Sequence, residues 1–124
     1  MFFLLGLIVL TTTVFFLRNR QAIFDGNMIK NADAYILEFT KMNQEDSHTL
    51  TLDKGDILSV DFAVGSGRVD LSIGMDEEEA IYRANEMDTG VFELTVPKKG
   101  DYQITVRARH ASGYIKITLH GQDK

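Results

Sequence analysis

The chain has 124 residues, of which 44% are hydrophobic and 25% charged, a size that fits one globular domain with an appendage but not two domains. It contains no cysteine, which excludes disulfides, thiolate nucleophiles, cysteine-based zinc sites and lipidation of a cysteine. The only charged residues among the first 20 are Arg18 and Arg20, so the remainder holds 11 basic and 18 acidic side chains, and its net charge of −7 argues against nucleic-acid binding.

Residues 1–17 carry no charge and are apolar on every face, which predicts one N-terminal hydrophobic helix. Such a helix would span about 25 Å, at the low limit for crossing a bilayer. The segment is therefore a transmembrane anchor or the apolar region of a signal peptide. We prefer an anchor or uncleaved signal, because Arg18 to Gln21 follow directly and Ala22 has no small partner two positions away, as a cleavage site would need.

The orientation of this membrane segment has two interpretations. No lysine or arginine precedes the apolar run, whereas Arg18 and Arg20 follow it, and the positive-inside rule then places the rest of the chain in the cytoplasm. A basic leader upstream of residue 1 would reverse that orientation. The residue pattern by itself leaves both orientations open.

Residues 18–32 predict a linker, because Asp25-Gly26-Asn27 and Lys30-Asn31 form turns readily and few neighbours are apolar. Residues 33–124 then predict a single β domain. Short runs in which apolar and polar residues alternate recur about every ten residues, separated by turns that contain glycine. Eight strands are expected, over residues 35–40, 50–52, 58–64, 69–73, 81–82, 92–96, 102–108 and 115–119.

One apolar face on each strand predicts an all-β fold, an antiparallel β-sandwich with Greek-key or jelly-roll connections. Tight turns predict one hairpin at 53–56 and another at 111–113, and 65–67 predicts a turn that ends a strand. The aromatic residues expected to point into the core are Phe39, Phe62, Phe92 and Tyr102.

Three segments carry a family resemblance: GDILSVDFAV at 55–64, GRVDLSI at 67–73 and GVFELTVPKKGDY at 90–102. Together they resemble the GOLD domain, a β-sandwich of secretory-pathway cargo receptors, and the similar small sandwich of bacterial pre-peptidase C-terminal domains. The resemblance covers about residues 50–119. It implies a noncatalytic accessory or binding module outside the cytoplasm, although the chain lacks the paired cysteines of the cargo receptors.

The residues offer little for catalysis or metal binding. His48, His110 and His120 stand alone, without the spacing of a metal site, and no Gly-x-Ser-x-Gly elbow or phosphate-binding glycine loop is present. The acidic run from Asp76 to Glu79 lacks the spacing of a calcium loop, so it is interpreted as a solvated loop tip. We therefore expect no catalytic residues, no cofactor, no metal and no enzyme activity.

A binding face is the remaining candidate site. The outward residues of the last predicted hairpin include Arg107, Arg109 and Lys116, with His110 and Tyr114 nearby, and would form a small basic stripe on an acidic domain. Such a stripe suits an acidic or aromatic partner. The alternative is ordinary cross-strand pairing of these cations with neighbouring acids, and that interpretation is favoured.

These expectations combine into one hypothesis with two alternatives. The first is a membrane-anchored, noncatalytic β-sandwich, held by its N-terminal helix and presented outside the cytoplasm to a protein or peptide partner. The second is a structural subunit that assembles with itself or with a larger complex on the cytoplasmic side. The third is a small carbohydrate-active or hydrolytic protein.

Overall fold

The computed structural model describes residues 22–121, which form an antiparallel all-β fold. The strands are β1 (Ile23–Lys30), β2 (Ala34–Leu52), β3 (Ile57–Gly74), β4 (Tyr82–Ala84), β5 (Thr89–Thr95) and β6 (Gly100–Gly121). The predicted all-β class is confirmed. The predicted N-terminal helix over 1–17 lies outside the described residues, and a search of residues 22–121 finds no helix long and apolar enough to cross a membrane.

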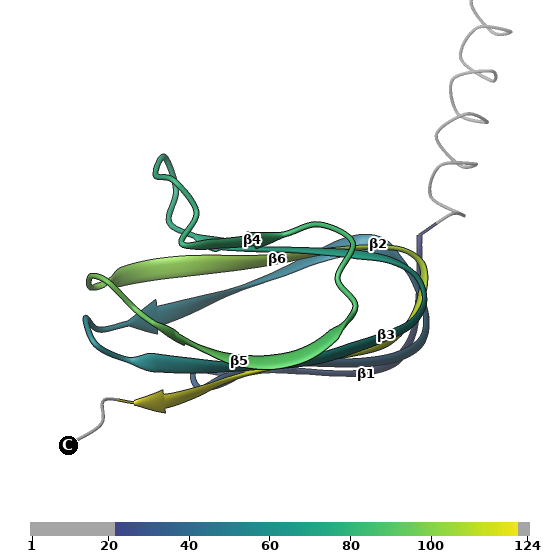
Figure 1. Cartoon of the computed structure of the whole chain (residues 1–124), viewed down its shortest axis with the longest axis horizontal. Helices are drawn as coiled ribbons and strands as arrows, with labels where there is room; N and C mark the ends of the chain where they lie inside the picture. The colour runs from purple at the N-terminus through teal and green to yellow at the C-terminus, as the bar shows by residue number, and fades with distance from the viewer. Residues whose placement is uncertain (1–21, 122–124) are drawn as a thin grey trace, which may run out of the picture.

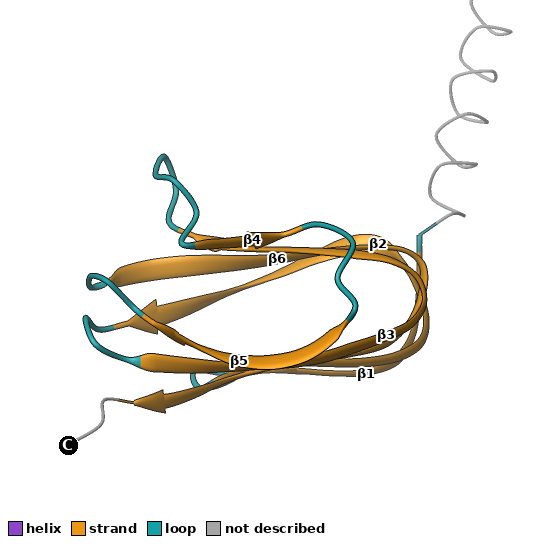
Figure 2. Cartoon of the chain, in the orientation of Figure 1, coloured by secondary structure: helices purple, strands orange, loops and turns teal. Residues whose placement is uncertain are grey.

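The strands form one continuous sheet that folds over on itself (Figures 1 and 2). Its order is β1-β2-β6-β3-β4, and β5 pairs with the first part of β3. The three long strands β2, β3 and β6 each run through both layers. We call the layer that contains β1, β5 and residues 34–39, 57–64 and 113–121 the first layer, and the layer with β4 and residues 44–52, 68–74 and 100–108 the second layer.

The long strands bend together at one end of the molecule, which we call the bend end. The register shifts there, between Phe39 and Gln44 in the β2–β6 pairing and between Val64 and Arg68 in the β3–β6 pairing. Such β-bulges bend a strand without ending its pairing. The turns that join β2 to β3 and β5 to β6 lie at the opposite end (Figure 2).

Two glycines make these bends sterically feasible. Gly67 has a φ of 76°, and a Cβ there would lie 2.2 Å from the carbonyl oxygen of His110. Gly113 has a φ of 143°, and its Cβ would lie 2.0 Å from the carbonyl oxygen of Ala63. The backbones of β3 and β6 thus approach so closely at the bend that only a residue without a side chain fits.

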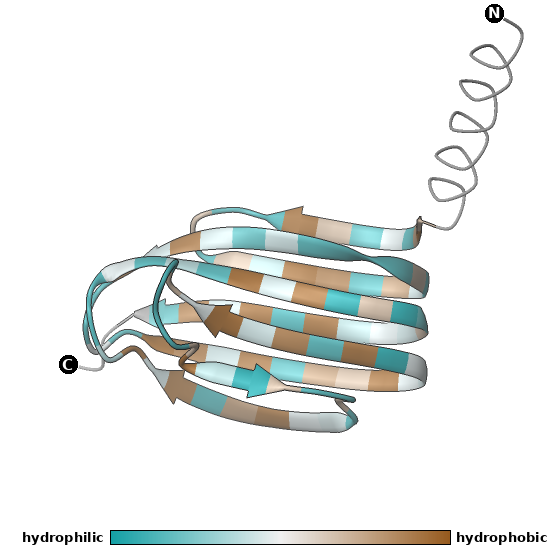
Figure 3. Ribbon diagram, turned by 90° about the horizontal axis from the view of Figure 1, so that it is seen from above, coloured by the Kyte–Doolittle hydropathy of each residue, from teal (hydrophilic) through white to brown (hydrophobic). Residues whose placement is uncertain are grey.

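The core lies between the two layers and follows the alternation along each strand (Figure 3). Leu37, Leu58 and Ile117 of the first layer and Leu71 and Ile104 of the second are at most 1% exposed. The expected inward aromatics divide into two groups, since Phe39 and Tyr102 are buried whereas Phe62 and Phe92 are partly buried and pack against the rim of the core.

Several expected boundaries differ from the structure. Six of the eight expected strands merge in pairs into β2, β3 and β6, because the chain between the members of each pair, including the bends at 65–67 and 111–113, stays inside one strand. The unexpected strand β1 then brings the total to six. The turn at 53–56 does not close a hairpin, because β6 lies between β2 and β3, so this turn crosses from one layer to the other. Within the expected linker at 18–32, Ile23–Lys30 forms β1.

Candidate functional site

The predicted basic stripe is divided by the fold. Its five residues all lie on β6, but β6 folds over at the bend end. Arg107 and Arg109 therefore project from the outer face of the second layer, whereas Tyr114 and Lys116 project from the outer face of the first layer. His110 lies at the bend between them, with a positive φ of 46°. The structure thus forms two separate groups and no single stripe.

The first-layer group is a set of cross-strand contacts. The Tyr114 hydroxyl donates a hydrogen bond of 3.1 Å to Asp61, and this contact, with a smaller contribution from desolvation, raises the pKa of Tyr114. Lys116 Nζ lies 3.7 Å from Glu38 and 5.0 Å from the centre of the Tyr114 ring. Lys116 thus has two acids beside it, Glu38 and Asp61, which lies opposite it in the register, as expected for ordinary cross-strand pairing.

The second-layer group lines a hollow that we call the second-layer trough. It has a volume of about 490 Å³ and is lined by Glu45, Asp70, Leu71, Ser72, Arg83, Asn85, Gln103, Thr105 and Arg107. The polar residues come from β2, β3, β4 and β6, on the positions that alternate with buried neighbours. Asn85 follows β4. The trough is therefore built on rigid strands, and its floor carries side chains that donate and accept hydrogen bonds.

Three of the four charges in the trough are compensated. Arg107 Nε lies 3.5 Å from Glu45. Burial disfavours the charged form of Asp70, but the backbone N–H of Glu86 at 2.8 Å and the guanidinium of Arg68 at 3.2 Å outweigh burial and hold the pKa of Asp70 below its usual value. Asp70 is therefore ionised at neutral pH.

Arg83 is the uncompensated charge. It lies at the centre of the short strand β4, opposite Ser72, between the inward residues Tyr82 and Ala84. It has no hydrogen bond and no ion pair with any residue in the range 22–121. Arg83 was not predicted as a site residue, although its position between Tyr82 and Ala84, which pack against the core, indicates an outward side chain.

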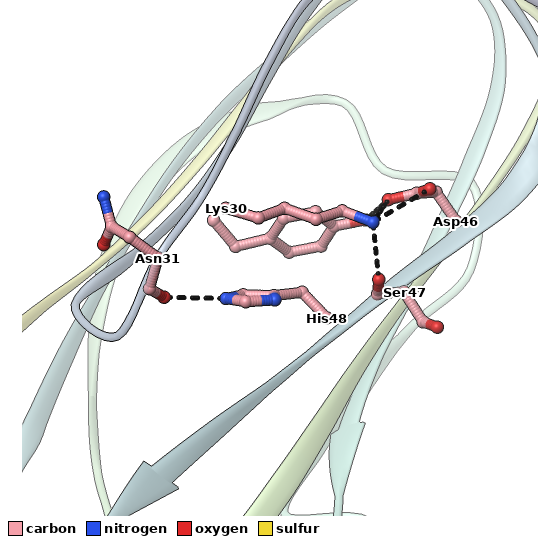
Figure 4. A network of polar contacts seen from close by, with 6 residues as sticks. Lys30, Asn31, Asp46, Ser47 and His48 are labelled. Atoms are coloured by element: carbon pink, nitrogen blue, oxygen red, sulfur yellow. Dashed lines mark hydrogen bonds and ion pairs between the residues drawn. The ribbon is translucent and has the colours of Figure 1, made fainter.

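A polar network closes the side of the sandwich where β1 and β2 lie (Figure 4). The Tyr35 hydroxyl, from the first layer, donates a hydrogen bond of 2.5 Å to Asp46 of the second layer. Lys30 Nζ lies 3.1 Å from the same carboxylate and donates to the carbonyl of Ser47. His48 Nε2 lies 2.7 Å from the carbonyl oxygen of Asn31. These contacts join the layers and are interpreted as structural.

The remaining residues weighed for chemistry are dispersed. Glu78 forms an ion pair with Lys98, which accounts for one member of the acidic run at 76–79. No three His, Asp or Glu side chains within residues 22–121 are grouped so that they could hold a metal ion. The trough is thus the hollow with the clearest set of convergent polar groups.

Comparison with known proteins gives similarity of structure alone. No family model matches the chain, and no curated protein matches it. The crystal structure of Aeromonas hydrophila PliG, a periplasmic lysozyme inhibitor of g-type lysozyme, matches 80% of this chain and 96% of that one, with 16% sequence identity and a TM-score of 0.52. A 4-O-methyl-α-glucuronidase of family GH115 matches 85% of this chain and 17% of that one, with 14% identity and a TM-score of 0.38, too low to support an argument. The chain is therefore similar in fold to PliG.

Proposed function

We propose that this chain is a noncatalytic β-sandwich module that acts outside the cytoplasm and binds a protein partner through the second-layer trough. The observation that carries the proposal is the likeness to PliG, which extends over nearly all of that periplasmic inhibitor. Because residues 22–121 are similar in fold to an inhibitor, we infer a function that depends on binding. The membrane anchor at 1–17 and the resemblance to GOLD and pre-peptidase C-terminal domains remain part of this proposal.

The chemistry of the trough supports binding over catalysis. A general acid needs a raised pKa, whereas the pKa of Asp70 is lowered and its carboxylate is already bound to Arg68 and the N–H of Glu86. Arg83, by contrast, offers a guanidinium without a partner among the described residues. A guanidinium binds a carboxylate through two parallel hydrogen bonds, so the trough suits an Asp or Glu side chain of the partner.

Neutral groups around Arg83 complete the recognition surface. Ser72, Thr105, Asn85 and Gln103 line the same trough and supply hydroxyl and amide groups. Such groups fix the orientation of a bound side chain without adding charge. An interface of this composition resembles the polar, wet interfaces of non-obligate complexes.

The location is tested on spheroplasts, whose outer envelope has been opened, from cells that express the full chain with a C-terminal epitope tag. External protease should remove the tag signal without prior lysis, and a cytoplasmic marker should stay intact in the same sample. Protection of the tag until lysis would place the domain in the cytoplasm and contradict the proposal.

The binding surface is tested by titrating purified full chain, in detergent, into g-type lysozyme and measuring residual activity. Inhibition that weakens roughly tenfold in Arg83→Ala, and stays unchanged in the matched variant Lys116→Ala on the opposite face, would support the trough as the binding surface. Equal losses in both variants, or no inhibition by the native chain, would contradict this assignment.

A further inference from the structure

The strand β5 is an open edge of the sheet. It pairs with β3 through seven residues in unbroken register, from Ile57 opposite Thr95 to Ala63 opposite Thr89. On its other side no strand of residues 22–121 pairs with it, and it lies at the outer side of the molecule opposite to β1 (Figure 3). An open edge presents a row of backbone N–H and C=O groups that can pair with another strand.

The other edges carry features that oppose pairing. β1 has a bulge between Asp25 and Gly26 and ends in Lys30, and β4 has only three residues. The second-layer part of β2 carries the inward charge of Asp46, which is held by the network in Figure 4. Bulges, lysines, short length and inward charges are the usual ways in which proteins protect an edge. β5 has no bulge, no lysine and no proline, so it is the unprotected edge of the described sheet.

The side chains of β5 also suit pairing. Val91 is the most exposed large apolar residue of the described chain, at 69%. On the inner side, Phe92 is only partly buried and lies against the rings of Phe62 and Tyr82, with centroid distances of 6.1 and 4.7 Å. A strand added at this edge would cover both Val91 and Phe92.

We propose that β5 pairs antiparallel with β5 of a second copy of this chain, in a two-fold symmetric register centred on Val91. This register places Val91 opposite Val91 of the second copy, Glu93 opposite Thr89 and Phe92 opposite Gly90. Sliding one strand by a single residue would place Val91 opposite Phe92 or Gly90 and so oppose the outer face of one copy to the inner face of the other. A register centred on Phe92 would place Val91 opposite Glu93, and one centred on Glu93 would place two carboxylates together. Within the chain an aromatic ring already packs on Gly90, because Phe62 lies opposite Gly90 in the β3–β5 pairing and its ring lies 3.2 Å from where a Cβ of residue 90 would be.

The self-complementarity of residues 89–93 is the reason to choose a second copy over an unrelated peptide. In the symmetric pair the exposed Val91 contacts Val91 of the second copy, and each Glu93 lies opposite a Thr89. In this register the two Glu93 residues are four residues apart along the strands, about 13 Å, beyond the screening length of about 8 Å at physiological salt. Because paired edge strands keep their faces, both second-layer troughs would open on the same side of the dimer.

The natural absence of cysteine allows a direct test on the full chain in detergent. Val91→Cys should form a disulfide-linked dimer under mild oxidation, since residues directly opposite in an antiparallel pair lie within disulfide range. Glu93→Cys, on the same strand and the same face, is the matched control and should remain monomeric on a non-reducing gel. Equal cross-linking of both variants would overturn the proposed register.

A second measurement keeps the proposal independent of cysteine chemistry. Analytical ultracentrifugation should show a monomer–dimer equilibrium for the native chain, and Val91→Lys should raise its dissociation constant roughly tenfold or more because two ammonium groups would face each other. Val91→Thr should retain the dimer. A native chain that is monomeric at all concentrations tested, or a Val91→Lys variant that dimerises as well as the native chain, would overturn the proposal. Neither outcome bears on the trough, because Val91 lies in the other layer.

Discussion

The Tyr35 hydroxyl donates a 2.5 Å hydrogen bond to Asp46, and both residues belong to the same strand. They are eleven positions apart, and they meet because β2 folds over at the bend end and returns in the second layer. The contact therefore ties the two layers together on the side where β1 lies. The ring of Tyr35 is fully buried, so the hydroxyl could not reach water if the contact were lost.

We expect Tyr35→Phe to lower the free energy of unfolding by about 1–2 kcal/mol, because a hydrogen bond to a charged group is removed and the Asp46 carboxylate loses one partner. Urea unfolding of the full chain in detergent measures the change. The matched control is Tyr114→Phe, which removes a similar hydrogen bond to Asp61 on the outer face. Its cost should be no more than about 0.5 kcal/mol, and equal losses in the two variants would contradict the role assigned to Tyr35.

The same contact predicts a loss of stability at alkaline pH. Burial, together with the hydrogen bond and the charge of Asp46, raises the pKa of Tyr35 far above its ordinary value. In the unfolded chain a tyrosine ionises near pH 10, whereas Tyr35 in the folded chain keeps its proton. The contribution of Tyr35 to the free energy of unfolding is therefore complete below about pH 10. Above that pH it is lost, by up to about 1.4 kcal/mol per pH unit.

Urea midpoints between pH 8 and pH 11 test this dependence. The native chain should lose stability above pH 10, and Tyr35→Phe should remove most of that slope while Tyr114→Phe removes less. A slope that is unchanged in Tyr35→Phe would show that another group causes the alkaline loss.

Replacing Gly67 with alanine should destabilise the fold by at least about 2 kcal/mol, because φ is 76° and the new Cβ would meet two backbone carbonyls of β6. Gly65 is the matched control two positions away. A Cβ at Gly65 would lie 3.2 Å from Ser112 Oγ, a side-chain atom that can rotate, and 3.8 Å from the carbonyl oxygen of Ser112, an ordinary contact distance. We expect Gly65→Ala to change the unfolding free energy by less than about 1 kcal/mol. A similar cost at both positions would argue against the close approach of β3 and β6 at the bend.

The strands with one apolar face were predictable from alternation alone. Leu58 and Val60, and then Val69 and Leu71, are buried as their pattern indicates. In the second part of β2 only residues 50–52 were predicted as a strand, because the inward positions before them include Asp46 and His48, whose polarity hides the alternation. β1 was assigned to a linker because most of its side chains are exposed at an edge.

Glycine explains why β3 and β6 were each divided into two expected strands, and it also explains the error in the candidate site. A glycine permits a turn that ends a strand and also a bulge that lets the strand continue, and the sequence does not distinguish the two. Reading Gly113 as the centre of a hairpin placed Arg107 and Lys116 on one face. The bend at Gly113 instead carries β6 into the other layer, so the two cations face opposite directions. Arg83 could be identified as part of the trough only when β4 was placed beside β3.

The hydrogen bonds of Asp70 predict a loss of stability at acid pH. Its folded pKa is held below the unfolded value by the Glu86 N–H and by Arg68, against the effect of burial. The contribution of Asp70 to the free energy of unfolding is therefore complete above about pH 4, the ordinary pKa of an aspartate. It is lost as the pH falls through the lower pKa that Asp70 has in the folded chain. The hydrogen bond from the Glu86 N–H to Asp70 also helps to hold Glu86 in its left-handed conformation, with a φ of 54°.

Asp70→Asn should lower stability at pH 7 by about 1 kcal/mol and flatten the decline of the urea midpoint below pH 4. Asp76→Asn, in the loop between β3 and β4, makes the same change in net charge and is the control. If Asp70→Asn and Asp76→Asn gave the same acid profile, net charge and not the contacts of Asp70 would determine the acid sensitivity of this fold.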